Sequence, residues 1–159
     1  MQIRIIAVGK IKEGFLREGI AEYFKRLRTY CRLEIHEVQE EKLAGIQTEK
    51  EAEILKLREA EKIRALIPKS SFVIVLDMRG KSWTSQDLAT RMASLELGGE
   101  NQVTFIIGGA TGLSESIRDD ADIILSLSRM TLTHQMARLI LLEQIYRAFR
   151  ICRGEPYHK

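Results

Sequence analysis

A strand followed by a glycine-rich loop and a helix is the pattern that most restricts the fold of this chain. The apolar run at 103–107 is rich in β-branched and aromatic residues, and Gly108, Gly109 and Gly112 follow it within five positions. Ser114 then stands where a helix N-cap is expected. In a parallel sheet, ligands bind at the carboxyl ends of the strands, and glycine lets the backbone lie directly against a ligand. The pattern predicts either a ligand-binding loop or a loop that only leads the chain into a helix.

The glycine loop matches neither of two common phosphate-binding motifs. Its spacing is not Gly-x-Gly-x-x-Gly, and neither Lys-Ser nor Lys-Thr follows the last glycine. The dinucleotide fingerprint and the phosphate loop of nucleotide triphosphatases require those residues. A nucleotide-binding module of the flavodoxin or Rossmann type is therefore disfavoured, and it stays as an alternative.

Apolar runs of strand length alternate with helical patterns along the chain. They predict five strands, at residues 3–8, 33–38, 72–76, 103–107 and 123–127. This alternation is typical of an α/β fold with a mainly parallel sheet sandwiched by helices. The strand ends near Leu76, Gly108 and Leu127 are then expected to line one crevice.

Two of the helices begin with recognisable capping boxes. Thr48 with Glu51 starts one helix, and Thr84 with Asp87 starts another. Trp83 precedes the second box and is expected to pack on the first turn of that helix rather than to stack on a base. The helix that follows Thr48 has a surface rich in Glu, so we expect it to lie away from an anionic partner.

One domain, residues 1–159, accounts for the whole sequence. The chain has 159 residues, of which 45% are hydrophobic, enough for one sizeable core. It has 2 prolines, no low-complexity tract and no repeat of fixed period, so no domain boundary is indicated. The run at 3–8 is too short for a signal peptide, and no run approaches the ~20 apolar residues of a membrane span. We expect a cytoplasmic protein without a membrane segment.

The cysteines and histidines show no metal-binding arrangement. Cys31 and Cys152 form no Cys-x-x-Cys pair, and His36, His134 and His158 form no cluster in the sequence. We expect both cysteines to be reduced thiols. No metal site is predicted.

The segment 134–151 predicts a long final helix with more apolar residues than one buried face requires. A second apolar surface of this size favours association, so we expect the helix to pack on the sheet and on a second copy of the chain. Ile140 and Leu141 are expected on the outward stripe. A monomer in which another segment covers this surface is the alternative. The apolar residues are Met136, Ala137, Leu139, Ile140, Leu141, Leu142, Ile145, Tyr146, Ala148 and Phe149.

Positive charge gathers in two places. The net charge is +3, and residues 128–159 contain six Lys or Arg and two Glu, which leaves the rest of the chain at about −1. We expect the C-terminal part to face an anionic partner, unless its charges serve solubility alone. The first helix ends with Lys25, Arg26, Arg28 and Arg32. These cations either contact RNA or complement the C-terminus of the helix.

Several motifs together resemble those of one family. The chain resembles, over its whole length, the ribosomal RNA large subunit methyltransferase H family of the SPOUT class. Many members are aromatic at the position of Leu132, so only a backbone contact is expected there. The motifs are Ala7-Val8-Gly9-Lys10, Glu22-Tyr23-Phe24-Lys25-Arg26, Leu76-Asp77-x-x-Gly80-Lys81, Gly108-Gly109-x-x-Gly112, the run from Leu127 to Met136, Glu143-Gln144-Ile145-Tyr146-Arg147-Ala148 and the terminal run from Arg153 to Lys159.

This resemblance implies methylation of N3 of a pseudouridine in 23S ribosomal RNA, within the ribosome or the large subunit, with S-adenosylmethionine as the cofactor. It also implies a C-terminal trefoil knot, an exception to the rule against threaded chains. A ribosome assembly factor without catalytic activity, which would also have a basic C-terminal region, is the second alternative. Carried over by position, the cofactor-binding residues are Leu76, Gly108, Leu127, Ser128, Arg129, Met130, Thr131 and Leu132.

The C-terminal tail is the expected source of catalytic groups. The resemblance places residues 153–159 near the cofactor site, that of the opposite subunit of a homodimer. Tyr157 offers a stacking surface for a splayed base, and His158 titrates near neutrality. His158 or Arg147 is expected to stabilise the N3 anion. The candidate catalytic residues are therefore His158, Tyr157 and Arg147, and the alternative is a frayed end without a role.

Overall fold

One parallel sheet forms the centre of the molecule. The computed structural model describes residues 1–41 and 48–156, and in these residues five strands pair in the order β2-β1-β4-β3-β5. Each described pairing is parallel, as the alternation of strands and helices predicted. The strands are β1 (Gln2–Val8), β2 (Arg32–Val38), β3 (Phe72–Ser82), β4 (Gln102–Ile107) and β5 (Ile123–Ser126).

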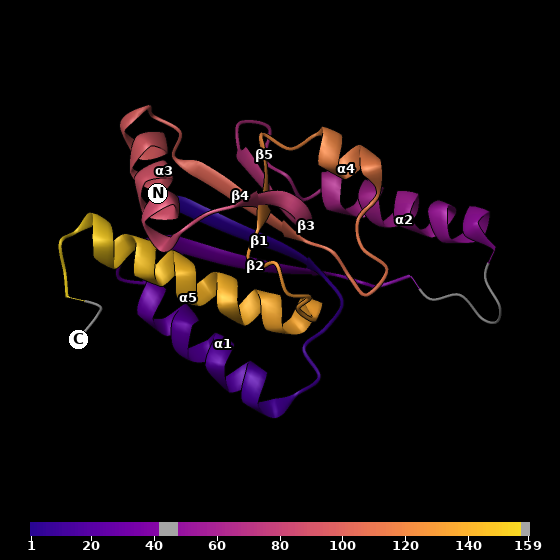
Figure 1. Ribbon diagram of the computed structural model, residues 1–159, viewed down its shortest axis with the longest axis horizontal. Coiled ribbons are helices and arrows are strands. Elements are labelled where there is room, and N and C mark those ends of the chain that lie inside the picture. The colour runs from indigo at the N-terminus through magenta and orange to yellow at the C-terminus, as the bar shows by residue number, and fades with distance from the viewer. Residues whose placement is uncertain (42–47, 157–159) are drawn as a thin grey trace.

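Helices cover both faces of the sheet. Figure 1 shows α1, α3 and α5 on one face and α2 and α4 on the other, which confirms the predicted α/β sandwich. Within the described residues, no helix is long and apolar enough to cross a membrane. The helices are α1 (Gly14–Leu27), α2 (Glu49–Arg64), α3 (Ser85–Leu97), α4 (Glu115–Asp119) and α5 (His134–Cys152).

The central strands are buried on both faces because successive side chains point in opposite directions. In β1, Ile3 and Ile5 belong to the core under α1, α3 and α5, whereas Ile6 and Val8 belong to the core under α2 and α4. Such strands read as continuous apolar runs rather than alternating ones. This is why short apolar runs sufficed to predict the central strands.

The predicted capping boxes are both present. The hydroxyl of Thr48 accepts from the backbone N–H of Glu51, and the hydroxyl of Thr84 accepts from that of Asp87, with each acid returning a bond to its cap. Trp83 is half-buried and packs on the core that contains α3, in line with the predicted staple. Ser114 is the N-cap of α4 as predicted, but its hydroxyl pairs with that of Ser116 instead of with a backbone N–H.

Strand β3 is longer than the predicted 72–76 and pairs with β5 twice. Both Leu76 and Lys81 lie opposite Leu125, with an irregularity between them, so residues 77–80 bulge away from the ladder. At Gly80 the two backbones nearly touch, because an added Cβ would lie 2.6 Å from the carbonyl of Ile124. Only glycine tolerates this approach. The C-terminal trefoil knot stays a prediction.

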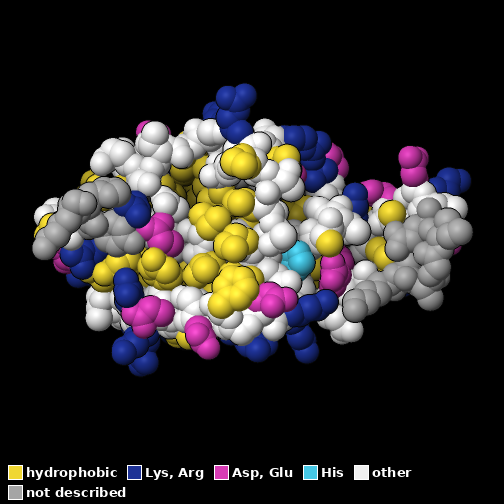
Figure 2. All heavy atoms as spheres, turned by 60° about the horizontal axis from the view of Figure 1, so that its bottom comes forward, with side chains coloured by type: hydrophobic (Ala, Val, Ile, Leu, Met, Phe, Trp, Pro, Cys, Tyr) yellow, Lys and Arg dark blue, Asp and Glu magenta, His cyan; other side chains and the backbone are white. Residues whose placement is uncertain are grey.

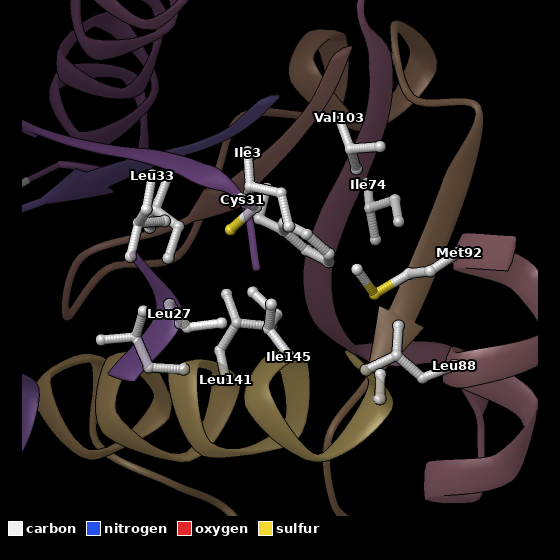
Figure 3. Packing of buried hydrophobic residues seen from close by; sticks show 14 of the residues in the cluster. Ile3, Leu27, Cys31, Leu33, Ile74, Leu88, Met92, Val103, Leu141 and Ile145 are labelled. Atoms are coloured by element: carbon white, nitrogen blue, oxygen red, sulfur yellow. The ribbon is translucent and has the colours of Figure 1, made fainter. Parts of the chain in front are cut away.

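Helix α5 packs between α1 and α3 against the sheet, and one prediction about it is wrong. Figure 3 shows Leu141 and Ile145 pointing into the core toward the strands, and Leu141 is 0% exposed. Leu141 is therefore not on an outward stripe. Ile140, which precedes Leu141 by one residue, is half-buried. Its side chain is turned by about 100° around the helix axis from that of Leu141 and so points away from the core.

Candidate active site

A pocket of about 420 Å³ opens where β4 and β5 end and where β3 leaves the ladder after Leu76. Its volume lies within the range of small-molecule sites in proteins. The walls are mostly apolar, with Leu76, Ile107, Leu113, Leu125 and Leu127 among the lining residues. A ligand here would lie at the carboxyl ends of three neighbouring strands, which is where the sequence predicted the crevice.

The glycine loop after β4 forms one side of this pocket with almost bare backbone. Gly108, Gly109 and Gly112 all line it, and Gly112 has φ +78°, a left-handed conformation that glycine adopts without strain. A Cβ at Gly108 would lie 2.9 Å from Cγ of Leu113, so this glycine is also required by the packing of the loop itself. The carboxylate of Glu40 accepts from the N–H of Ala110 and supports the loop from outside.

The bulge of β3 supplies the most polar wall. Asp77 lines the pocket, and its carboxylate accepts from the backbone N–H of Arg79 at 2.9 Å and from the guanidinium of Arg118 at 3.2 Å. Burial alone raises the pKa of Asp77, but these hydrogen bonds and the two nearby guanidinium groups outweigh it and hold the pKa below its usual value. Asp77 is therefore a fixed negative charge at the pocket.

Arg118 joins the two loops that form the polar side of the pocket. Besides Asp77, its guanidinium donates to the carbonyl of Leu113 at 2.7 Å and pairs with Glu115. Its side chain is 12% exposed and that of Asp77 is 16% exposed, so the bond between these two is largely shielded from water, whereas Glu115 is exposed. Arg118 thus holds the glycine loop at a set distance from the β3 bulge.

The segment between β5 and α5 closes the third side. Leu127, Ser128, Met130 and Leu132 line the pocket, and the hydroxyl of Ser128 accepts from the N–H of Met130 at 2.9 Å, which turns the chain around the opening. At the start of α5, His134 also lines the pocket. The exposed methionines Met78 and Met130 leave an apolar rim at its mouth.

Comparison with known proteins assigns the chain to a family. A family model described as "Predicted SPOUT methyltransferase" matches residues 1–158. The chain belongs to the SPOUT methyltransferase family. It is 54% identical to the ribosomal RNA large subunit methyltransferase H of Carboxydothermus hydrogenoformans, 52% to that of Clostridioides difficile and 51% to that of Halothermothrix orenii, in each case over 100% of both chains.

A solved structure is similar to this SPOUT methyltransferase in fold. A probable methylase family protein from Haemophilus influenzae aligns with a TM-score of 0.55 and 13% identity, over 99% of this chain and 70% of that one. At that identity the likeness concerns the fold alone. It places the same α/β arrangement in a distant protein.

The structure brings together six of the eight residues predicted to contact the SPOUT cofactor. Those lining the pocket are Leu76, Gly108, Leu127, Ser128, Met130 and Leu132. Arg129 and Thr131 alternate with them along the chain, and neither is among the lining residues; the hydroxyl of Thr131 instead contacts the sulfur of Met78 at 3.7 Å. Asp77 and His134 line the pocket and Arg118 holds Asp77, but none of the three was predicted as a site residue, although Asp77 is the first polar residue after an apolar strand.

Of the candidate catalytic residues, Arg147 does not line the pocket of its own SPOUT chain. Arg147 lies ten residues beyond Ala137, the last residue of α5 at the pocket, which corresponds to about 15 Å along the helix. Its guanidinium is held by Glu143 one turn earlier. Tyr157 and His158 lie outside the described residues.

The start of the tail is tied to the fold. Glu155 accepts from the hydroxyl of Tyr30 at 2.6 Å and pairs with Arg150 at 2.8 Å. Arg150 also donates to the carbonyl of Pro156 at 2.8 Å. Residues 153–156 thus have a structural role that the sequence analysis did not assign to them.

Neither cysteine is paired, and no metal cluster is found in the described part of the chain. Cys31 and Cys152 are free thiols, as predicted. Within residues 1–41 and 48–156, no group of three His, Cys, Asp or Glu is arranged to hold a metal ion.

Proposed function

We propose that this protein transfers a methyl group from S-adenosylmethionine to N3 of a pseudouridine in 23S ribosomal RNA, in the cytoplasm, on the ribosome or its large subunit. One observation supports this most strongly: residues of the motifs that resemble those of the family, far apart in sequence, line a single pocket. The choice of N3 as the methylated atom, and of pseudouridine as the nucleotide, rests on the resemblance to the family.

The residues of the pocket fit this cofactor. Bare backbone at Gly108 and Gly112 and apolar walls at Leu76 and Leu127 suit an adenine and its ribose. Asp77 carries a negative charge that suits the ammonium and sulfonium groups. S-adenosylmethionine supplies a methyl group on a positively charged sulfur, which is already a strong donor.

The contribution expected from the chain is alignment, exclusion of water and control of one proton. The wall at 127–132 and the glycine loop hold the methyl donor in one orientation. Because the donor is already oriented, less entropy is lost when it meets the nucleotide. The exposed side chains of Met78 and Met130 give the mouth an apolar rim against which an entering base can pack. N3 of pseudouridine must lose its proton, and a cation beside the developing anion stabilises it. We assign this role to Arg147 or His158, with Tyr157 stacking on the base.

These residues act on the pocket of a second subunit in our proposal. Arg147 is about 15 Å along α5 from its own pocket, so a homodimer through α5 supplies the missing groups. Figure 2 shows hydrophobic side chains gathered in the middle of the face formed by α1 and α5. On α1, Phe15 is 62% exposed, and on α5, Met136 and Ile140 are half-buried. Apolar surface of this kind supports a partner in contact with it.

The direct test uses ribosomes from a strain that lacks the enzyme. These are incubated with the purified protein and S-adenosylmethionine labelled in its methyl group, and the rRNA is digested and analysed by mass spectrometry. We expect the label in one methylpseudouridine of 23S rRNA, with none in heat-inactivated controls. Label in another nucleotide, in 16S rRNA or in protein refutes the proposed substrate, and binding of ribosomes without label favours an assembly factor.

A further inference from the structure

A second concavity lies between α1 and the edge strand β2, on the far side of the β1–α1 loop from the pocket. Its volume is about 710 Å³, and part of its wall is apolar, with Ile20, Phe24 and Ile35. The rest is strongly cationic. We call it the basic groove and define it by Lys10, Arg17, Lys25, Arg28 and Arg138, against which the lining residues include one carboxylate, that of Glu37.

Three cations of the basic groove make no side-chain hydrogen bond or ion pair in the described part of the chain. Within residues 1–41 and 48–156, no hydrogen bond or ion pair engages the side chains of Lys10, Lys25 or Arg28. Arg26, between the last two, behaves differently: its guanidinium pairs with Glu22 at 2.8 Å, outside the groove. On α1, Arg26 is therefore neutralised by Glu22 outside the groove, whereas Lys25 and Arg28 line the groove without an ion pair among the described residues.

The cations of α1 are not engaged in capping the helix. The carbonyl of Arg26 accepts from the hydroxyl of Thr29, and that of Leu27 accepts from the backbone N–H groups of Tyr30 and Cys31. Lys25 and Arg28 make none of these bonds. Their side chains therefore make no bond to the last carbonyls of α1 and remain available to a ligand in the groove.

A buried arginine connects the basic groove to the pocket. Arg138 of α5 is 2% exposed, donates to the carbonyl of Gly9 at 2.9 Å and pairs with Glu37, while its Nε is buried without a hydrogen-bond partner. Gly9 in turn packs on His134, since an added Cβ would lie 3.1 Å from its Nε2. His134 lines the pocket. The loop that begins at Gly9 is thus a shared wall between the two concavities.

We propose that the basic groove binds the phosphodiester backbone of the RNA substrate next to the nucleotide that enters the pocket. This inference rests on the proposed function for the identity of the RNA. Unpaired lysines and arginines in a concave surface attract phosphates and release their counterions on binding, and the apolar wall suits riboses and bases. Phosphate contacts orient an RNA without reading its sequence, which is what delivery of one nucleotide to the pocket requires.

The test compares two double variants of equal charge change. Lys25→Gln with Arg28→Gln neutralises the groove, and Lys50→Gln with Arg58→Gln neutralises exposed cations of α2 on the opposite face of the sheet. Binding to protein-free 23S rRNA is measured by filter retention between 50 and 300 mM salt. Losing two phosphate contacts should lower the slope of log K against log salt by about 1.5 and weaken binding roughly 10- to 30-fold at 0.1 M salt.

We expect these losses in the groove variant and wild-type behaviour in the α2 variant, with S-adenosylmethionine affinity and melting temperature unchanged in both. In the methylation assay, the groove variant should raise KM for ribosomes more than it lowers kcat. Equal salt slopes for the two variants overturn the inference. A loss confined to intact ribosomes, with naked rRNA bound as by the wild type, also overturns it, because the groove then docks on an acidic protein.

This experiment separates the inference from the proposed function. If wild-type protein transfers no methyl group to ribosomes, the proposed function fails, but the salt slopes with rRNA still decide whether the groove binds phosphates. If the wild type methylates and the groove variant has an unchanged KM and slope, only the groove inference fails.

Discussion

Two neighbouring positions of α5 provide a sharp test of the dimer. Ile140→Asp and Leu141→Asp introduce the same carboxylate one residue apart, at a half-buried and at a fully buried position. If the outward side of α5 is a subunit interface, the first variant should dissociate the dimer and leave each chain folded. The second should unfold the chain, because its side chain belongs to the core (Figure 3).

The magnitudes follow from burial. Complete burial of an isoleucine side chain contributes about 1.5–3 kcal/mol, and since Ile140 is already partly covered, we assign about half of this to the interface. A twofold dimer loses it twice, about 1.5–3 kcal/mol, or roughly 10- to 150-fold in Kd. An uncompensated carboxylate in the interface costs a further ~3–5 kcal/mol. At Leu141, removal of the buried side chain alone costs about 3–5 kcal/mol, comparable with the total stability of many domains.

Analytical ultracentrifugation over a range of concentrations and thermal unfolding followed by circular dichroism measure these effects. We expect Ile140→Asp to sediment as a folded monomer at micromolar concentration and Leu141→Asp to lack a cooperative transition. A matched Ile140→Val variant should stay dimeric. If Ile140→Asp remains a dimer with wild-type affinity, or if the wild type is a monomer, the assignment of the interface to α5 is wrong.

Three further predictions concern single residues. Gly80→Ala should destabilise the chain by several kcal/mol in urea unfolding, because its Cβ would overlap the backbone of Ile124, whereas Gly14→Ala, whose Cβ meets only the end of Arg17, should change stability by less than ~1 kcal/mol. Gly108→Val should cost about 1–3 kcal/mol by displacing Leu113 and should abolish S-adenosylmethionine binding in calorimetry; binding at wild-type affinity would mean that the loop is only structural. Burial raises the pKa of the Cys31 thiol to about 11, so iodoacetamide at pH 8 should leave Cys31 unmodified in the native protein, and its rapid alkylation relative to Cys152 would contradict the buried placement.

Local patterns predicted most of the fold because most of its strands are buried on both faces. The predicted 103–107 and 3–8 runs coincide with β4 and β1 to within a residue, since an unbroken β-branched run leaves little choice. The extension of β3 to Ser82 could not be predicted. Apart from Met78, its residues 77–82 are polar or glycine, and Lys81 and Ser82 pair with β5 only because Gly80 allows that backbone to approach. The family predicted from the motifs is confirmed by the full-length match.

Side-chain direction on apolar helices was the main limit. Helix α5 is apolar on most of its circumference, so the sequence could not decide which leucine faces the sheet, and Leu141 was placed on the wrong side. The same limit applied to α1, where Lys25 and Arg28 differ from Arg26 only in the direction their side chains take. Asp77 was missed as a site residue because its position depends on the bulge of β3 and on Arg118, which is 41 residues away.

A mixing experiment decides whether the pocket and the tail of one active site come from different subunits. Truncation after Pro156 removes Tyr157, His158 and Lys159 but retains Glu155, whose contacts with Tyr30 and Arg150 hold the start of the tail. We expect this variant and Gly108→Val to be inactive separately. When the two are coexpressed in equal amounts, half of the dimers are mixed, and each has one intact pocket opposite one intact tail, so about a quarter of the wild-type methylation rate should return. If each tail serves the pocket of its own chain, no mixed dimer contains a complete site. Mixtures that stay inactive, although mass spectrometry detects mixed dimers, would therefore place the catalytic groups within one subunit.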